Sequence, residues 1–172
     1  MPLTAVTVLG QDRPGIIAAV TGALADLGGN IEDSSMTLLR GHFAMTLIVS
    51  ADVEPMEIEA ALAPVAQSMG LIVAARTVPT DHGIAVGGTH HLLTVHGGDR
   101  SGIVSAITDL VARRGGNITD LTTRLAGDLY VLVAELDLPQ DTDTDALASE
   151  LAKVANSLGV EASLRVAEAD LL

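Results

Sequence analysis

The chain is organised around Gly10-Gln11-Asp12-Arg13-Pro14-Gly15, which is followed further on by Gly28-Gly29-Asn30-Ile31. Both stretches return later, as Gly97-Gly98-Asp99-Arg100-Ser101-Gly102 and Gly115-Gly116-Asn117-Ile118. The offset is 87 residues in both cases, from 10 to 97 and from 28 to 115. This internal repeat predicts two similar domains of about 80 to 87 residues, a size that can fold around its own core.

Apolar periodicity predicts the elements of the first copy. Residues 3–9 alternate as a half-buried strand does, and Asp12 and Pro14 mark the start of a helix that Gly28 ends. A strand from Ile31, a turn at 40–42, a strand over 43–49, a helix over 55–69 and a strand over 71–78 follow. On the second strand we expect these side chains to point inward: Ser34, Met36 and Leu38. The order βαββαβ predicts a ferredoxin-like α+β domain, an antiparallel sheet with both helices on one face.

The second copy repeats this order. His91, Leu93 and Val95 are expected on the inner face of its first strand, and Gly127-Asp128 at the turn of its hairpin. We therefore expect one domain at 1–79, a glycine-rich linker at 80–89, a second domain at 90–168 and a short tail at 169–172.

Charge and composition exclude several classes of function. The formal net charge is −13, with 22 acidic against 9 basic residues, and such a field repels phosphate backbones. Aromatic residues are 1% of the chain, so bases find no stacking platform, and we expect no direct nucleic-acid binding. Cysteine is absent and no apolar run reaches the roughly 18 residues of a membrane span. We expect a soluble cytoplasmic protein without membrane contact.

The two glycine loops are the candidate ligand sites. The loop from Gln11 to Gly15 joins the carboxyl end of a strand to the amino end of a helix, where backbone N–H groups and the helix dipole favour an anion. We expect Asn30 to start the next strand from the same end of the sheet. An α-carboxylate on the loop amides, with an α-ammonium on Asn30 Oδ1 or a backbone carbonyl, would suit a free amino acid.

The Asp-Arg-Pro-Gly and Asp-Arg-Ser-Gly turns, with Gly-Gly-Asn-Ile into the second strand, resemble the ACT domain. Two such domains filling the chain resemble the tandem-ACT family of the glycine cleavage system transcriptional repressor. The resemblance implies a non-catalytic regulator that binds glycine or serine at domain interfaces, as a homodimer, and signals to a transcription factor or enzyme. It implies no cofactor. The ligand-binding residues that it implies are Gln11, Asp12, Arg13, Pro14, Gly15, Asn30, Ile31, Gly98, Asp99, Arg100, Ser101, Gly102, Asn117 and Ile118.

Structural explanations compete with this interpretation. Asp12 and Asp99 are also good helix caps, and the glycines and asparagines are also common turn residues. Ser101 in place of Pro14 makes the second loop more flexible, so ligand binding by the first copy alone stays open. A ligand-independent interaction module is the alternative function.

Metal binding and catalysis have weak support. His90 and His91 point to opposite faces of a strand, as do His91 and His96, so the three cannot share a metal. His96 lies close enough to the second loop to touch a ligand. The aspartates of 141–145 lack the glycine and distal glutamate of a calcium loop and suit the first turn of a helix. Arg13 and Asn30 echo the phosphate-binding pair of acylphosphatases, which is the enzyme alternative.

The sheet face without helices also points to an interface. In our register it carries Thr7, Ala44, Thr46 and Ile48 in the first copy, and Thr94, Val131 and Val133 in the second. Small and apolar side chains there predict contact with another sheet or domain, which favours a homodimer.

Overall fold

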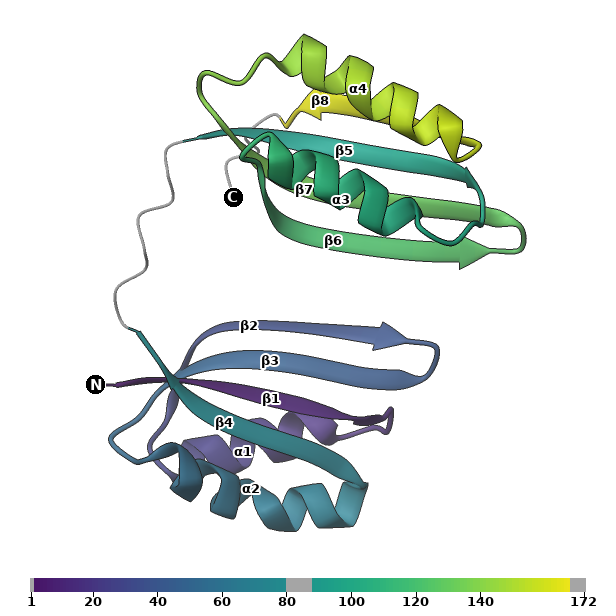
Figure 1. Cartoon of the computed structure of the whole chain (residues 1–172). Coiled ribbons are helices and arrows are strands. Elements are labelled where there is room, and N and C mark those ends of the chain that lie inside the picture. The colour runs from purple at the N-terminus through teal and green to yellow at the C-terminus, as the bar shows by residue number, and fades with distance from the viewer. Residues whose placement is uncertain (1, 80–87, 168–172) are drawn as a thin grey trace. The chain divides into compact units, whose positions relative to one another are not determined.

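The computed structural model describes residues 2–79 and 88–167. The chain divides into two compact units, Met1–His82 and Gly83–Leu172. Within the described residues, each unit has four strands and two helices in the order βαββαβ (Figure 1). The prediction of two ferredoxin-like α+β domains in tandem is therefore confirmed.

The first domain is a four-stranded antiparallel sheet with strand order β2-β3-β1-β4. Both of its helices lie on one face of the sheet (Figure 1). Its elements are β1 (Leu3–Gln11), α1 (Ile16–Asp26), β2 (Asn30–Leu39), β3 (His42–Ser50), α2 (Pro55–Met69) and β4 (Leu71–Val78).

The second domain has the matching order β6-β7-β5-β8, again antiparallel and again with both helices on one face (Figure 1). Its elements are β5 (Gly88–Gly98), α3 (Ile103–Arg113), β6 (Asn117–Ala126), β7 (Leu129–Pro139), α4 (Thr144–Ser157) and β8 (Val160–Val166). Gly88 and Thr89 belong to β5, so the expected linker at 80–89 overlaps the strand. Residues 80–87 of that linker and the expected tail lie outside the described residues.

The cores follow the predicted periodicity. In the first domain Val6 and Val8 of β1 are buried against Ile16, Val20 and Leu24 of α1. In the second domain the expected inner face of β5 is confirmed, because His91, Leu93 and Val95 are all buried. Each domain therefore has its own apolar core between the sheet and the two helices.

The expectation that three side chains of β2 point inward is correct for the face they share but wrong for their burial. Ser34, Met36 and Leu38 pair with buried residues of β3 and so share the face that carries the helices, but all three are exposed. β2 is an edge strand, and among the described strands it pairs with β3 alone. The helix-side face of β2 therefore remains accessible at its carboxyl-terminal half.

The helix starts also differ from the prediction. α1 begins at Ile16 rather than near Asp12, and its N-cap is Gly15 at φ 92°. α3 begins in the same way after Gly102, also at φ 92°. Both loops thus have the same backbone conformation, one that glycine adopts at little cost.

We predict opposite stability effects for two glycines. A Cβ at Gly97 would lie 2.8 Å from Val160 Cα, a backbone atom of β8, so Gly97→Ala should destabilise the second domain by about 1–3 kcal/mol. A Cβ at Gly22, inside α1, would meet open space, so Gly22→Ala should stabilise the chain by about 0.5–1 kcal/mol. Urea unfolding of both variants measures the two effects. An unchanged midpoint in Gly97→Ala would contradict the close approach of β5 and β8.

Candidate functional site

The loop between β1 and α1 projects from one end of the first sheet. Asp12 N–H donates to Gly41 O at 2.9 Å, which ties the loop to the β2–β3 turn. Neither Gly15 nor Gly102 has a side-chain cap, so the alternative that Asp12 and Asp99 cap the helices is wrong. The N–H groups of the first turn of α1 have no partner within the helix and are directed toward the loop.

A hollow of about 490 Å³ lies over this loop. Its lining combines two charged side chains of the loop with apolar residues of α1, β2 and β3. Its lining residues are Asp12, Arg13, Pro14, Gly15, Ile16, Ile17, Ala18, Met36 and Phe43. The structure thus brings together four of the predicted residues, Asp12 to Gly15, and adds an apolar wall. Such a volume suits a small ligand.

Asn30 and Ile31 do not join this site within one domain, which corrects our expectation. Asn30 pairs with Ser50, which also pairs with Leu3, whereas Gln11 pairs with His42 at the other end of the sheet. Eight residue steps along β1 separate the two ends, roughly 26 Å. Asn117 and Ile118 are placed in the same way in the second domain, where Asn117 pairs with Asp137 and Gly98 with Leu129.

The second loop differs from the first in the position of its arginine. A Cβ at Gly159, just after α4, would lie 3.4 Å from Arg100 Cζ and Nε. The Arg100 guanidinium therefore packs over the carboxyl end of α4, where the helix dipole favours a cation. A Cβ at Gly70, the corresponding position after α2, would meet nothing within 4 Å, and Arg13 instead lines the hollow.

The histidines of β5 alternate as predicted. His91 is buried, with Nδ1 3.0 Å from Thr89 O, while His96 lies on the face away from α3, with Nε2 3.5 Å from Glu161 Oε2. His96 therefore faces away from the second loop's helix. His90 Nδ1 lies 2.5 Å from Asp137 Oδ1.

The aspartates of 141–145 mark a helix start. Asp143 is the N-cap of α4, where its Oδ1 accepts from Ala146 N–H at 2.9 Å, and Asp145 lies in the first turn. In residues 2–79 and 88–167, no three His, Asp or Glu side chains gather in a way that could hold a metal ion. In the same part of the chain no helix combines the length and the apolarity that crossing a membrane requires.

The apolar wall of the hollow was missed in the sequence. Met36 precedes the β2–β3 turn and Phe43 follows it. Because β3 pairs antiparallel with both β1 and β2, this turn lies at the end of the sheet where β1 ends and the first loop begins. The signal was therefore the hairpin turn at Arg40 and Gly41, read together with the strand order.

Fold and loop together define a tandem pair of ferredoxin-like modules with a small-molecule hollow beside a helix start. The chain belongs to the ACT domain family, whose model matches residues 4–76 and 89–165. It is an ACT-domain regulatory protein by this membership.

Known proteins resemble the chain over one domain or over both. A UPF0237 protein of Methanopyrus kandleri is 41% identical over 76 residues, 42% of this chain and 84% of that protein. A crystal structure of an unknown protein from Galdieria sulphuraria is 27% identical with a TM-score of 0.80, covering 97% of this chain and 99% of that one. A putative glycine cleavage system transcriptional repressor is 20% identical with a TM-score of 0.73, covering 97% and 98%. That last likeness shows the tandem fold.

Proposed function

We propose that this chain is a non-catalytic regulatory protein that binds a small free amino acid, glycine or serine, at the β1–α1 loop of its first domain. The observation that carries the proposal is the hollow in which Asp12 and Arg13 lie beside the uncapped start of α1. A zwitterion needs one group of each sign at short range, and this loop offers both.

The groups of the hollow match the two ends of an amino acid. The ligand carboxylate would accept from Arg13 and from the free N–H groups of the first turn of α1, where charge-assisted bonds and the helix dipole add. The ligand ammonium would donate to the Asp12 carboxylate. Ile17 and Met36 would exclude water from the other side.

Ligand binding at the loop would be transmitted to a partner through the β2–β3 hairpin. The loop is bonded to this hairpin at Gly41, and Met36 of β2 lines the hollow. A ligand that favours one placement of the hairpin would supply a coupling of about 1–3 kcal/mol, which is the usual size for allosteric proteins. We propose that a protein partner, a transcription factor or enzyme, senses this shift.

We further propose that the chain forms a homodimer through the face of the first sheet that lacks helices. Thr7, Ala44, Thr46 and Ile48 alternate with buried residues and therefore lie on this face, as the sequence predicted. Leu9 pairs with Ala44 and with Ile72, which adds two exposed apolar side chains to the same face. Apolar surface of this kind favours association.

Arg13→Ala tests the amino-acid site. The variant loses a charge-assisted hydrogen bond to the carboxylate, so its affinity for the bound amino acid should fall about 10- to 100-fold. Isothermal titration calorimetry with glycine and serine measures the loss. Arg100→Ala is the matched control, because Arg100 packs over the end of α4. The affinity of this variant for the amino acid should stay within about two-fold of that of the parent chain.

Asn30→Ala distinguishes a site in one domain from a shared one. Asn30 lies at the far end of the sheet, so the substitution should leave the affinity unchanged. A loss equal to that of Arg13→Ala would mean that a neighbouring domain or copy supplies Asn30 to the ligand.

The second candidate function is a ligand-independent interaction module, which the exposed apolar side chains on the open face of the first sheet favour. Association of the full chain without response to any amino acid would support it. The acylphosphatase alternative loses its basis, because Arg13 and Asn30 lie at opposite ends of the sheet.

A further inference from the structure

A groove between α3 and α4 of the second domain holds a third of the chain's basic side chains. Three of the nine basic residues line it, and Lys153 is the single lysine of the sequence. The groove has a volume of about 520 Å³. Its lining residues are Leu110, Arg113, Arg114, Glu150, Lys153 and Val154.

We propose that this groove binds an acidic, partly apolar segment of a partner protein. The three basic groups and the two carboxylates beside them, Asp109 and Glu150, leave a local net charge of +1 in a chain whose formal charge is −13. An acidic partner is repelled by most of this chain and attracted here, which gives the contact its location and orientation.

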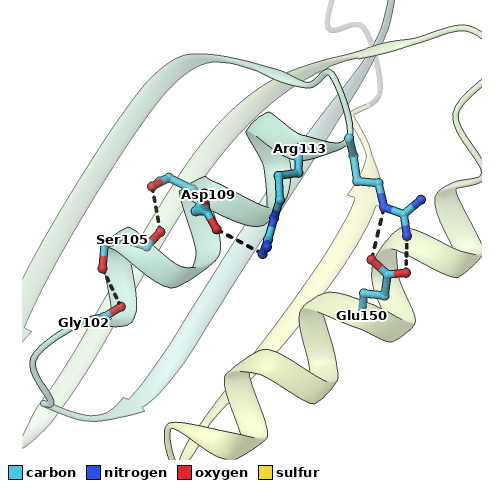
Figure 2. A network of polar contacts seen from close by, with 7 residues as sticks. Gly102, Ser105, Asp109, Arg113 and Glu150 are labelled. Atoms are coloured by element: carbon cyan, nitrogen blue, oxygen red, sulfur yellow. Dashed lines mark hydrogen bonds and ion pairs between the residues drawn. The ribbon is translucent and has the colours of Figure 1, made fainter.

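Ion pairs engage both arginines, one pair along α3 and the other between the end of α3 and α4 (Figure 2). Arg113 Nη2 lies 3.0 Å from Asp109 Oδ2, and Arg114 makes a bidentate contact with Glu150 of α4. A guanidinium has five N–H donors, so both arginines keep donors free of these contacts. Lys153 lies one turn after Glu150 on the same helix. The two arginines are thus partly ordered before a partner arrives, which lowers the entropy cost of binding.

The floor of the groove is apolar. Leu110 is buried and Val154 is partly buried against the domain core. A partner segment that presents a leucine or similar side chain between its carboxylates would cover this floor while its charges meet the arginines and the lysine. This combination matches an amphipathic acidic segment more closely than a uniformly charged one.

The basic lining of the groove is particular to the second domain. At an offset of 87 residues, Asp26 and Leu27 stand in the first domain where Arg113 and Arg114 stand in the second. The helix dipole favours arginines at the end of α3, but it does not account for Lys153, which lies before the last turn of α4. The basic cluster is therefore not a by-product of the repeated fold.

The exposure of the groups favours a protein segment over a small anion. The side chains of Arg113 and Arg114 are 65% and 46% exposed, so water and salt screen each cation from an isolated anion. A segment with several carboxylates engages all three cations together and removes apolar surface from water. Nucleic acid lacks apolar side chains for the floor, and the net charge of the chain opposes it.

A fluorescent peptide tests the proposal on the full chain. We expect a fluorescein-labelled peptide of repeated Leu-Glu-Glu-Leu blocks to bind by anisotropy, and to bind more weakly as salt rises. Arg113→Glu combined with Lys153→Glu should weaken binding at least about ten-fold. Arg165→Glu, a charge reversal on β8, is the matched control and should change affinity less than about two-fold.

Three outcomes would overturn the proposal: no binding by the parent chain, equal weakening by Arg165→Glu, or tighter binding of an oligothymidylate than of the peptide. The double variant should keep the amino-acid affinity of the parent chain, because the groove and the first-domain hollow share no residue. Loss of peptide binding with amino-acid binding intact separates this proposal from the proposed function.

Discussion

Gly15→Val should abolish most of the amino-acid binding of the chain, with a loss of affinity of about 100-fold or more. Gly15 holds φ at 92°, a conformation that costs a β-branched residue about 1–3 kcal/mol. A Cβ there would meet only Met69 Cε at 4.0 Å, so the effect comes from the backbone and not from crowding. The loop would relax and move Arg13 and the first amides of α1 away from the ligand. Calorimetry with glycine and serine measures the loss.

The repeat supplies the control for this variant. Gly102 has the same φ of 92° at the start of α3, and a Cβ there would meet nothing within 4 Å. Gly102→Val should therefore destabilise the second domain by a similar amount and leave the amino-acid affinity within about two-fold. Equal losses of affinity in both variants would place ligand in both loops and would contradict a site confined to the first domain.

Leu9→Asp should convert the proposed homodimer to a monomer. Leu9 lies on the open face of the first sheet between Ala44 and Ile72, where an unpaired carboxylate would be buried on association. Burial of such a charge costs several kcal/mol, so the dissociation constant of the dimer should rise more than about 100-fold. Light scattering during size-exclusion chromatography gives the oligomeric state.

Met56→Asp is the control for the dimer prediction. Met56 is 76% exposed in the first turn of α2, on the helix side of the sheet, where an acidic residue suits the helix dipole. This variant should remain a dimer. A Leu9→Asp protein that elutes as the parent does would contradict an interface at the open face.

The elements were predictable because local signals agreed. The capping box of Glu54 and Glu57 fixes the start of α2, and Gly70 at φ 68° fixes its end. Apolar periodicity then identified the buried faces of β1, β3, β5 and the helices, and the bounds of β4 and β8. These signals act over a few residues, so one sequence is sufficient to read them.

The composition of the site was less predictable because it depends on the path of the chain. α1 has 11 residues and returns the chain about 16 Å toward the end of the sheet where β1 began. β2 therefore starts at the end of the sheet away from the first loop. Asn30 is for this reason distant from Asp12, although the two residues are close in sequence. Met36 and Phe43 lie near the β2–β3 turn, where β2 has run back to the end of the sheet that carries the first loop.

The different positions of the Arg13 and Arg100 side chains could not be predicted from the sequences of their own loops. Both follow an aspartate and precede a glycine by two residues, and the two loops share one backbone conformation. The Arg100 guanidinium packs over Gly159, which follows α4, whereas Arg13 lines the hollow beside Met36. Contacts with distant elements decided the difference.

The most direct measurement is a titration of the purified chain with each of the twenty amino acids, by thermal shift and then by calorimetry on any that stabilise it. A ligand that binds the folded state stabilises it by RT ln(1 + [L]/Kd), about 2.7 kcal/mol at 100 times Kd. We expect glycine or serine to raise the unfolding temperature of the parent chain and not that of Arg13→Ala. No response to any of the twenty amino acids would contradict the account and would favour a ligand-independent interaction module.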